Sequence, residues 1–399
     1  MAITIHQTPQ LWTPAYNDQW ILALSTEIAQ PLFKYKIEIM VTNSDGAITF
    51  TYYVLPRPDG YLVFNCKEIV KNFVKHFIKP NDFTVLECVD SSVMVDILIY
   101  ETWTGEAGTG VIDATYFAWN ACLTEKQMFL DTYNYVDYVS TASESIIHTR
   151  GNVLPTTNYT LLSDVFMHFV KVLTLDHIIY YVLDTNGVDI LDTYTFNASS
   201  LTNNKIYQIN VSPQLAISET LPMAVGYYVL VKFFTSLNTE LASYQYLVSD
   251  PCTKHEIKRL YYLNRNGGIS FMSFELKSTK NISKQTNDVK LNRNEIVSNT
   301  WTYKPYKHER NVVSTQETFS EVLNTNWITK LQSEYLEELF SSPMVWLVSE
   351  EDDYSDPYKF KPVVITDKSY EYKKHENEKL FNYSVVVEYS TTETRQRAI

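Results

Sequence analysis

The sequence predicts a mainly β protein with a few helices, and two features of composition and one of pattern support this prediction. Tyr is abundant, with 30 residues among 399, and Phe and Trp add 19 and 7. Aromatic and β-branched side chains favour pleated, half-buried surfaces. Glycine is scarce, with 10 residues. Short alternating segments separated by turn residues recur along the chain, which is typical of all-β domains.

Residues 1–125 are predicted to form an N-terminal β-sandwich domain, because several short strands and turns follow one another. In the segment 33–56, apolar side chains at Tyr35, Ile37 and Ile39 alternate with charged neighbours, and NSDG forms the turn to the next strand. This alternation is typical of an antiparallel hairpin with one buried face. PRPDGY supplies a second tight turn, and further strands are expected from FTVLECV to VIDATYFAWNAC.

One helix is expected within this domain. From Asn65 the apolar period changes from two to about three and a half, with apolar residues at 69, 70, 73, 74, 77 and 78. Asn65 is the expected N-cap and Pro80 the expected end of this helix. The later GEAGTG segment lacks the Lys-Ser/Thr of a phosphate loop and is interpreted as a hairpin turn, not as a nucleotide site.

Residues 126–255 are predicted to form a second Ig-like β-sandwich. After a connection at 126–150 that has no clear period, strand-like segments recur between residues 155 and 250. The DTNG step between IIYYVL and VDILDTYTF is a strong hairpin signal. This spacing of strands and turns is typical of Ig or fibronectin-like sandwiches.

Residues 256–399 are predicted to form a C-terminal α+β assembly domain, a strand-helix-strand unit. Its first hairpin turns at NGG, between apolar strands. Residues 278–300 are polar and cannot bury enough apolar surface alone, so a loop arm that becomes ordered on contact with a neighbour is expected there. A strand is expected at 310–323, and the alternation of Val385, Val387 and Tyr389 marks a terminal strand.

An amphipathic helix is predicted in this domain, with Thr325 or Asn326 as its cap and SSP as its end before the strand MVWLV. The side chains expected to anchor this helix or to serve an interface are Trp327, Leu331, Leu336 and Leu339. Arg395 and Arg397 are expected either to reach carboxylates of a neighbouring molecule or to lie in a frayed tail.

The charge balance argues against nucleic acid and membranes as partners. Lys and Arg total 33 and Asp and Glu total 46, which gives a net charge of −13. Such a charge repels polyanionic duplexes and acidic lipid surfaces. No segment reaches the about 20 apolar residues that a membrane helix needs, and the N-terminal segment has no secretory-signal pattern. The four cysteines have no metal-ligand spacing, so they are expected to be reduced residues of a protein made in a cytosol.

No motif in the sequence predicts catalysis, and the chain is not expected to be an enzyme. The histidines are isolated, and HExxH, GxSxG, GxGxxG and P-loop patterns do not occur, so no catalytic residue, cofactor or metal is expected. The acidic cluster at 350–356 lacks EF-hand spacing and is interpreted as a solvated turn. Two alternatives stay open: a carboxylate pair that the fold brings together in a glycoside hydrolase, and exposed Trp and Tyr side chains that bind sugars.

Several segments resemble a known family. The C-terminal pattern TNWITKLQSEYLEELFSSPMVWLV, KPVVITDKSYEYKK, KLFNYSVVVEYS and RQR is similar to the C-terminal unit of virion structural proteins from tailed bacteriophages that infect Bacteroidota. YYLNRNGGISFMSFELK and the N-terminal TPAYND, FKYKIEIMV and PRPDGYLVFNCKEIVKNFV resemble further segments of that family. The resemblance covers both ends and about half of the chain, and TNW stands where the family pattern has TGW.

The resemblance implies a structural subunit that is made in the cytoplasm of the host bacterium and is located in the virion, at the tail tip or baseplate. The implied partners are further copies of the chain in a symmetric ring, a trimer or a hexamer, and other virion tail proteins. Two other virion roles are kept as alternatives. One is a receptor- or carbohydrate-binding adhesin that binds a host surface glycan, and the other is a collar or head-tail connection subunit.

Overall fold

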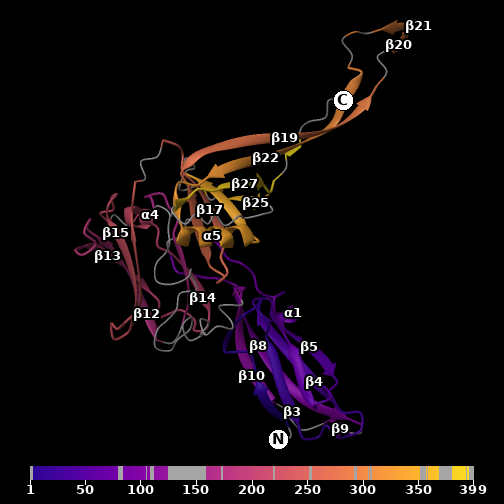
Figure 1. Cartoon of the computed structure of the whole chain (residues 1–399), viewed down its shortest axis with the longest axis vertical. Coiled ribbons are helices and arrows are strands. Elements are labelled where there is room, and N and C mark those ends of the chain that lie inside the picture. The colour runs from indigo at the N-terminus through magenta and orange to yellow at the C-terminus, as the bar shows by residue number, and fades with distance from the viewer. Residues whose placement is uncertain are drawn as a thin grey trace. The chain divides into compact units, whose positions relative to one another are not determined.

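The computed structural model divides into two compact units (Figure 1). The first unit comprises Met1–Pro251 and Leu263–Ser270, and the C-terminal unit comprises Cys252–Tyr262 and Phe271–Ile399. Both predicted sandwiches therefore belong to the first unit. The structure describes residues 3–79, 84–104, 106–107, 112–124, 159–171, 174–218, 221–250, 254–291, 294–303, 305, 308–350, 356, 358–367, 380–391 and 393–394.

The predicted fold class is confirmed. Two sheets form the N-terminal sandwich, with strand orders β1-β3-β6 and β2-β10-β8-β4-β5, and β9 pairs with β8. Their strands are β1 (Ile3–Gln7), β2 (Trp12–Pro14), β3 (Trp20–Ser25), β4 (Lys34–Asn43), β5 (Gly46–Val54), β6 (Tyr61–Asn65), β8 (Ser92–Trp103), β9 (Glu106–Ala107) and β10 (Ile112–Trp119).

Alternation in β4 places one face of the hairpin in the core, as predicted. Tyr35, Ile37 and Ile39 are fully buried, and β4 pairs with β5 from Tyr35↔Val54 to Asn43↔Gly46. They belong to the core cluster that also includes apolar residues of β3, β6, β8 and β10. Burial of this one face fixes the register, because a slip of one residue would expose every core side chain.

The predicted helix between Asn65 and Pro80 is wrong beyond its first turn. Only α1 (Lys67–Val70) is helical, and its N-cap is Cys66. The following segment makes tertiary contacts instead: the amide of Lys75 donates to the carbonyl of Asp90 at 2.8 Å. Aromatic and β-branched residues are weak helix formers, so contacts with the rest of the unit override the apolar period.

The second sandwich also has two sheets, with orders β11-β14-β7 and β13-β12-β15-β16. The predicted DTNG turn is confirmed, since Asp184 Oδ1 accepts hydrogen bonds from the amides of Val188 and Asp189. The predicted connection at 126–150 lies outside the described residues. The elements are β7 (Leu86–Glu87), β11 (Phe166–Val170), β12 (Leu175–Leu183), β13 (Ile190–Asn197), β14 (Ile206–Asn210), α4 (Pro213–Ser218), β15 (Tyr228–Thr235) and β16 (Glu240–Leu247).

One strand joins the two sandwiches within the first unit. β7 comes from the N-terminal segment, yet it pairs with β14 through Tyr207↔Glu87 and Gln208↔Leu86. A second apolar cluster lies at this junction and includes Trp12, Trp119 and Ile206.

The C-terminal unit is built on one sheet with the order β18-β17-β24-β25-β27-β22-β19, and β28 pairs with β22. Two short strands, β23 and β26, pair separately beside the helix α5. The elements are β17 (Lys258–Leu263), β18 (Ile269–Phe274), β19 (Leu276–Lys290), β20 (Asn294–Val297), β21 (Thr300–Tyr303), β22 (Arg310–Asn324), β23 (Ile328–Thr329), α5 (Lys330–Ser341), β24 (Val345–Ser349), β25 (Lys361–Ile365), β26 (Leu380–Phe381), β27 (Ser384–Tyr389) and β28 (Glu393–Thr394).

The helix α5 covers the core of this sheet. Leu336 and Leu339 are fully buried and lie in one cluster with apolar residues of β17, β18, β22, β24, β25 and β27. The helix ends at Ser341, at the predicted SSP. The predicted start is wrong, because β23 intervenes and Thr325 does not cap the helix: Thr325 Oγ1 instead accepts a hydrogen bond of 2.8 Å from the amide of Tyr383.

Two smaller observations concern sulfur and membranes. Cys66 and Cys88 are buried free thiols, and burial raises the pKa of Cys66 to about 12. Cys122 is also a free thiol, and it is exposed. None of the helices in the described parts of the chain is long and apolar enough to cross a membrane.

The turn between β17 and β18 belongs to the first unit and confirms the predicted NGG turn. Asn264 Oδ1 accepts hydrogen bonds from the amides of Asn266 and Gly268. Gly267 has φ +87°, and a Cβ there would lie 2.3 Å from the carbonyl oxygen of Asn120. Only glycine fits both the backbone conformation and the close approach.

Gly267→Ala is expected to lower the free energy of unfolding more than Gly46→Ala. Both positions have positive φ, so both variants carry a backbone cost of roughly 1–2 kcal/mol. Only at Gly267 would the new Cβ meet a backbone oxygen, because nothing lies within 4 Å of the corresponding position at Gly46. Denaturant unfolding of the two variants measures the difference, and equal losses would contradict the close packing of this turn.

Leu336→Ala and Trp327→Ala test which residues hold α5. Truncating the buried Leu336 is expected to cost about 2–5 kcal/mol. Trp327 is 60% exposed, so its truncation is expected to change stability by about 0.5 kcal/mol or less. Chemical denaturation followed by circular dichroism measures both, and a comparable loss in the two variants would contradict this packing of α5.

Candidate functional site

A two-stranded β-ribbon is the main candidate for an interaction site. β19 and β22 are each 15 residues long and pair antiparallel from Leu276↔Asn324 to Lys290↔Arg310. Figure 1 shows that they continue beyond the rest of the C-terminal sheet and carry β20 and β21 at their far end. We call residues 276–324 the ribbon arm. The predicted loop at 278–300 is therefore wrong, because most of this segment is paired strand.

The ribbon forms although neither face of β19 has an apolar pattern. Every residue of β19 is exposed except Ser278, which is half-buried. Backbone hydrogen bonding to β22 satisfies the backbone polar groups on one edge of β19. Thr279, Ile282, Thr286 and Val289 favour the extended chain. Hydrophobic periodicity could not reveal such a strand. The available signal was the β-branched residues, together with a strand-like segment of equal length after the turn.

β19 has a free edge. It is the last strand in its sheet, and among the described strands only β22 pairs with it. An edge strand presents unpaired backbone donors and acceptors that can pair with another chain. The long exposed edge of β19 therefore offers a template for a partner.

The tip of the ribbon arm is a hairpin with exposed apolar side chains. β20 and β21 pair with Ile296 opposite Trp301, and these side chains are 65% and 64% exposed. Ser298 and Asn299 between the strands both have positive φ, at 51° and 64°, as a type I′ turn requires. Exposed aromatic and aliphatic pairs of this kind are typical of interaction surfaces.

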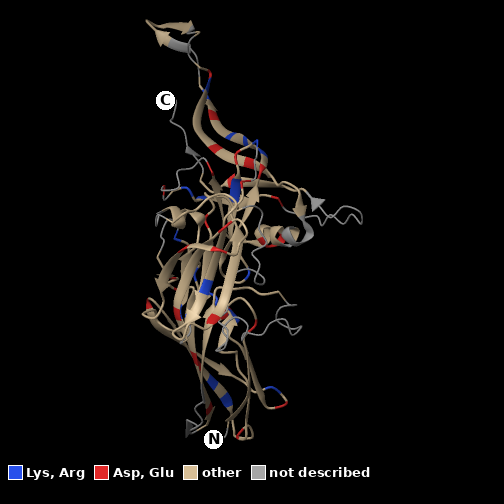
Figure 2. Ribbon diagram, turned by 90° about the vertical axis from the view of Figure 1, so that its left-hand side faces the viewer, with Lys and Arg blue, Asp and Glu red and all other residues tan. Residues whose placement is uncertain are grey.

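Ion pairs on the ribbon arm link β19 with the start of β22 and with the residue before it. Arg310 binds Asp288 through both Nε and Nη2, the second at 3.0 Å to Oδ1. The hydrogen bond from Arg310 lowers the pKa of Asp288. Lys290 Nζ lies 3.0 Å from Glu309 Oε1. Figure 2 shows charges of both signs along the arm.

The base of the arm is braced by buried and partly buried charges. Lys280 Nζ lies 5.4 Å from the centroid of the Phe319 ring and 5.3 Å from that of Tyr389. The Tyr389 hydroxyl donates to Glu321 Oε2 at 3.3 Å. Glu321 is 1% exposed and forms an ion pair with Lys258 of β17. Three strands separate β17 from β22 in the sheet order, so this pair also indicates that the sheet is strongly curved.

The sequence-predicted site residues have different places. Leu336 and Leu339 lie together in the core, whereas Trp327 is on the surface and does not pack there. The expectation that Trp327 anchors the helix by burial is therefore wrong, and its place at an interface stays a prediction. The side chain of Leu331 lies outside the described atoms, and Arg395 and Arg397 lie outside the described residues.

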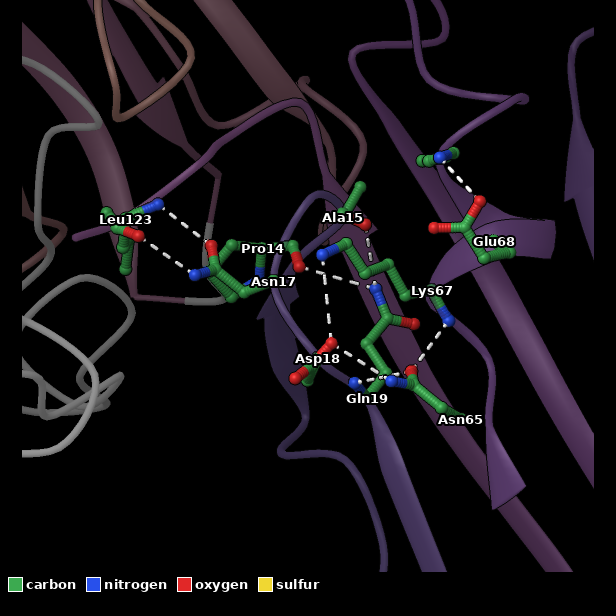
Figure 3. Close-up of polar contacts among 10 residues, drawn as sticks. Pro14, Ala15, Asn17, Asp18, Gln19, Asn65, Lys67, Glu68 and Leu123 are labelled. Carbon is green, nitrogen blue, oxygen red and sulfur yellow. Dashed lines mark hydrogen bonds and ion pairs between the residues drawn. The ribbon is translucent and has the colours of Figure 1, made fainter. Parts of the chain in front are cut away.

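Two N-terminal segments that carry the family resemblance meet in the first unit (Figure 3). Asn65 Nδ2 donates to Asp18 Oδ1 at 3.0 Å, and Asn65 Oδ1 accepts from the amide of Gln19 at 3.0 Å. Asn17 exchanges two hydrogen bonds with the backbone of Leu123, at 2.9 and 2.8 Å. These contacts connect loops of the sandwich, and their chemistry is structural. Within the described ranges, no group of three or more His, Cys, Asp or Glu side chains is placed to share a metal ion.

Comparison with known proteins adds little to these observations. No family model matches the chain, and no curated protein matches it. Among solved structures, the chain is similar to the FN1–FN3 domains of chicken CNTN1, with 8% sequence identity and a TM-score of 0.19. That match covers 62% of this chain and 66% of the chicken chain. Such a low score supports no argument about function.

Lys258→Met and Arg310→Met compare the stability contributed by two ion pairs. The first removes the pair of Lys258 with the buried Glu321 at the base of the arm, and the second removes the exposed pair of Arg310 with Asp288. Lys258→Met leaves Glu321 buried without its cation and is expected to cost about 3–5 kcal/mol. Arg310 is 77% exposed, so Arg310→Met is expected to leave the melting temperature unchanged, because solvent screens exposed pairs. Thermal unfolding of both variants measures the effects. A Lys258→Met variant with the melting temperature of the unmodified chain would contradict a stabilising role for the Lys258–Glu321 pair.

Proposed function

We propose that this chain is a structural subunit of a tailed-phage virion, located at the tail tip or baseplate, and that it works by holding neighbouring tail proteins in place. The ribbon arm is the observation that carries this proposal. An arm of paired strands with nearly every residue of β19 exposed adds little to the unit's own core. We therefore expect the arm to contact the surface of a partner protein.

The resemblance to virion proteins supports the same role, because its motifs fall on structural elements. LNRNGG is the turn whose glycine approaches Asn120. SSPMVWLV is the end of α5 followed by β24, and KPVVI is β25. These segments form a turn, the end of a helix and two strands, so the shared residues are expected to maintain a fold.

The composition also suits a subunit that must stay dispersed before assembly. The net charge of −13 favours solubility through mutual repulsion. The proposed partners are copies of this chain in a symmetric ring, a trimer or a hexamer, and other tail proteins. A collar position is the alternative location within the same proposal.

A glycan-binding role has weaker support. Three Trp side chains are strongly exposed, at 43% for Trp20, 64% for Trp301 and 60% for Trp327. They lie on β3, on the tip hairpin and before β23. Sugar binding by stacking needs aromatic rings that are gathered on one face, and these three come from separate elements.

Mass spectrometry of density-purified phage particles tests the proposed function. The chain is expected in intact particles and in isolated tails at a fixed ratio to other tail proteins, because a structural subunit has a set copy number. A glycan array serves as the control for the adhesin role. Absence of the chain from purified particles, or its loss from tails on washing without any change in their structure, would contradict the proposal.

A further inference from the structure

We infer that the ribbon arm binds a second copy of this chain, with the net-positive arm of one copy lying against the net-negative remainder of its neighbour. This inference rests on the proposed assembly role and names the partner of the arm. Three properties of the arm support it: its charge, its exposed apolar residues and its free edge.

The charge of the arm is opposite to that of the remaining chain. Residues 276–324 contain 8 Lys and Arg against 5 Asp and Glu, so 8 − 5 = +3. The remaining 350 residues contain 33 − 8 = 25 basic and 46 − 5 = 41 acidic residues, so 25 − 41 = −16. We call these 350 residues the body. The bodies of two copies therefore repel each other, whereas the arm of one copy and the body of the other attract each other. Charge complementarity of this kind guides association and selects the orientation.

The arm also carries apolar side chains that have no core to enter. Ile282 is 63% exposed, and Val289 and Leu291 are 48% and 47% exposed. At the tip, Ile296 and Trp301 form an exposed cross-strand pair. Apolar residues set among Lys and Arg match a partner surface that is acidic at its rim. Trp at the centre of such a contact contributes a large share of the binding free energy.

The free edge of β19 gives a second copy a place to pair. A two-stranded ribbon alone is marginally stable in water. Addition of a strand or a flat surface from another molecule would satisfy the edge and stabilise the ribbon. A polyanion such as nucleic acid is a less suitable occupant, because 5 acidic residues lie among the 8 basic ones and would repel it.

The test compares the full chain with three variants by sedimentation velocity over a range of protein and salt concentrations. In the first variant, residues 286–315 are replaced by Asn-Gly. This keeps the Gln285↔Gln316 pair and the pairing of β22 with β27 and β28. The second is Trp301→Ser on the tip. The third, Trp327→Ser, is the matched control for the arm, because Trp327 is about as exposed as Trp301 in the same unit but lies outside residues 276–324. The inference places the contact between copies on the arm, so the predicted interface of Trp327 would be with a different partner.

The full chain is expected to self-associate at about 100 μM or below and to do so less at about 0.5 M salt. Trp301→Ser is expected to weaken self-association by about tenfold or more, and the shortened arm to abolish it. Trp327→Ser is expected to stay within about twofold of the full chain. A chain that remains monomeric under all these conditions, or equal losses in the Trp301 and Trp327 variants, would overturn the inference.

Cross-linking of mixed isotopes identifies the partner. Light and heavy copies are mixed, cross-linked through lysines and analysed by mass spectrometry, with RNA and a mixture of tail proteins added in separate samples. Light-to-heavy links from Lys284 or Lys290 to the body of the other copy are expected. Links from the arm to another tail protein alone, or binding of the arm to RNA alone, would overturn the inference. The proposed function would stand if the chain were still found in purified tails.

Discussion

One long strand, β22, connects the core of the C-terminal unit with the ribbon arm, and the arm depends on it. The inner end of β22 pairs with β27 and carries the fully buried Leu323. Its outer end pairs only with β19 among the described strands. Because a paired strand is stiff, burial of the inner end sets the direction of the outer end (Figure 1). The buried pair of Lys258 with Glu321 lies where the two parts meet.

This arrangement explains how a mostly polar ribbon can be part of a folded protein. Nearly every residue of β19 is exposed, so the side chains of this strand cannot stabilise the ribbon as a core does. The stabilisation comes from the core of the C-terminal unit at the base of the arm, where α5 and the curved sheet bury Leu336, Leu339 and their neighbours. Ion pairs such as that of Arg310 with Asp288 add little in exposed positions but hold the two strands in register. The arm is thus available for a partner without requiring one in order to form its strands.

The sequence predicts those strands and helices of which one face is buried and the other is exposed to solvent. Tyr35, Ile37 and Ile39 can be assigned to a buried face because period two is visible only when the two faces differ. The DTNG and NGG turns are predictable because each needs particular residues at particular backbone conformations. The same reasoning predicts α5 and its buried leucines.

The failures have physical causes as well. Apolar spacing after Asn65 suits a helix, yet contacts with Asp90 and with β14 hold the segment after α1 in a non-helical conformation. Both faces of β19 are exposed to solvent, so its apolar residues do not alternate with polar ones. Its polar sequence therefore predicts a loop. The size of Trp327 and its place before a helix predict a buried anchor, whereas the short strand β23 lies between Trp327 and α5, and Trp327 is 60% exposed. The sequence identifies residues 278–300 as a polar segment without a core of its own. It does not predict that this segment is a strand, because the strand forms only by pairing with β22.

Amide hydrogen exchange across residues 277–290 tests the central claim most directly. The measurement compares the purified subunit with the same chain in assembled tails. If the ribbon arm holds a neighbour, amides on the outer edge of β19 exchange quickly in the subunit and become protected after assembly. Equal exchange in both states would mean that the arm stays in solvent, and the proposed role of the ribbon arm in assembly would then be wrong.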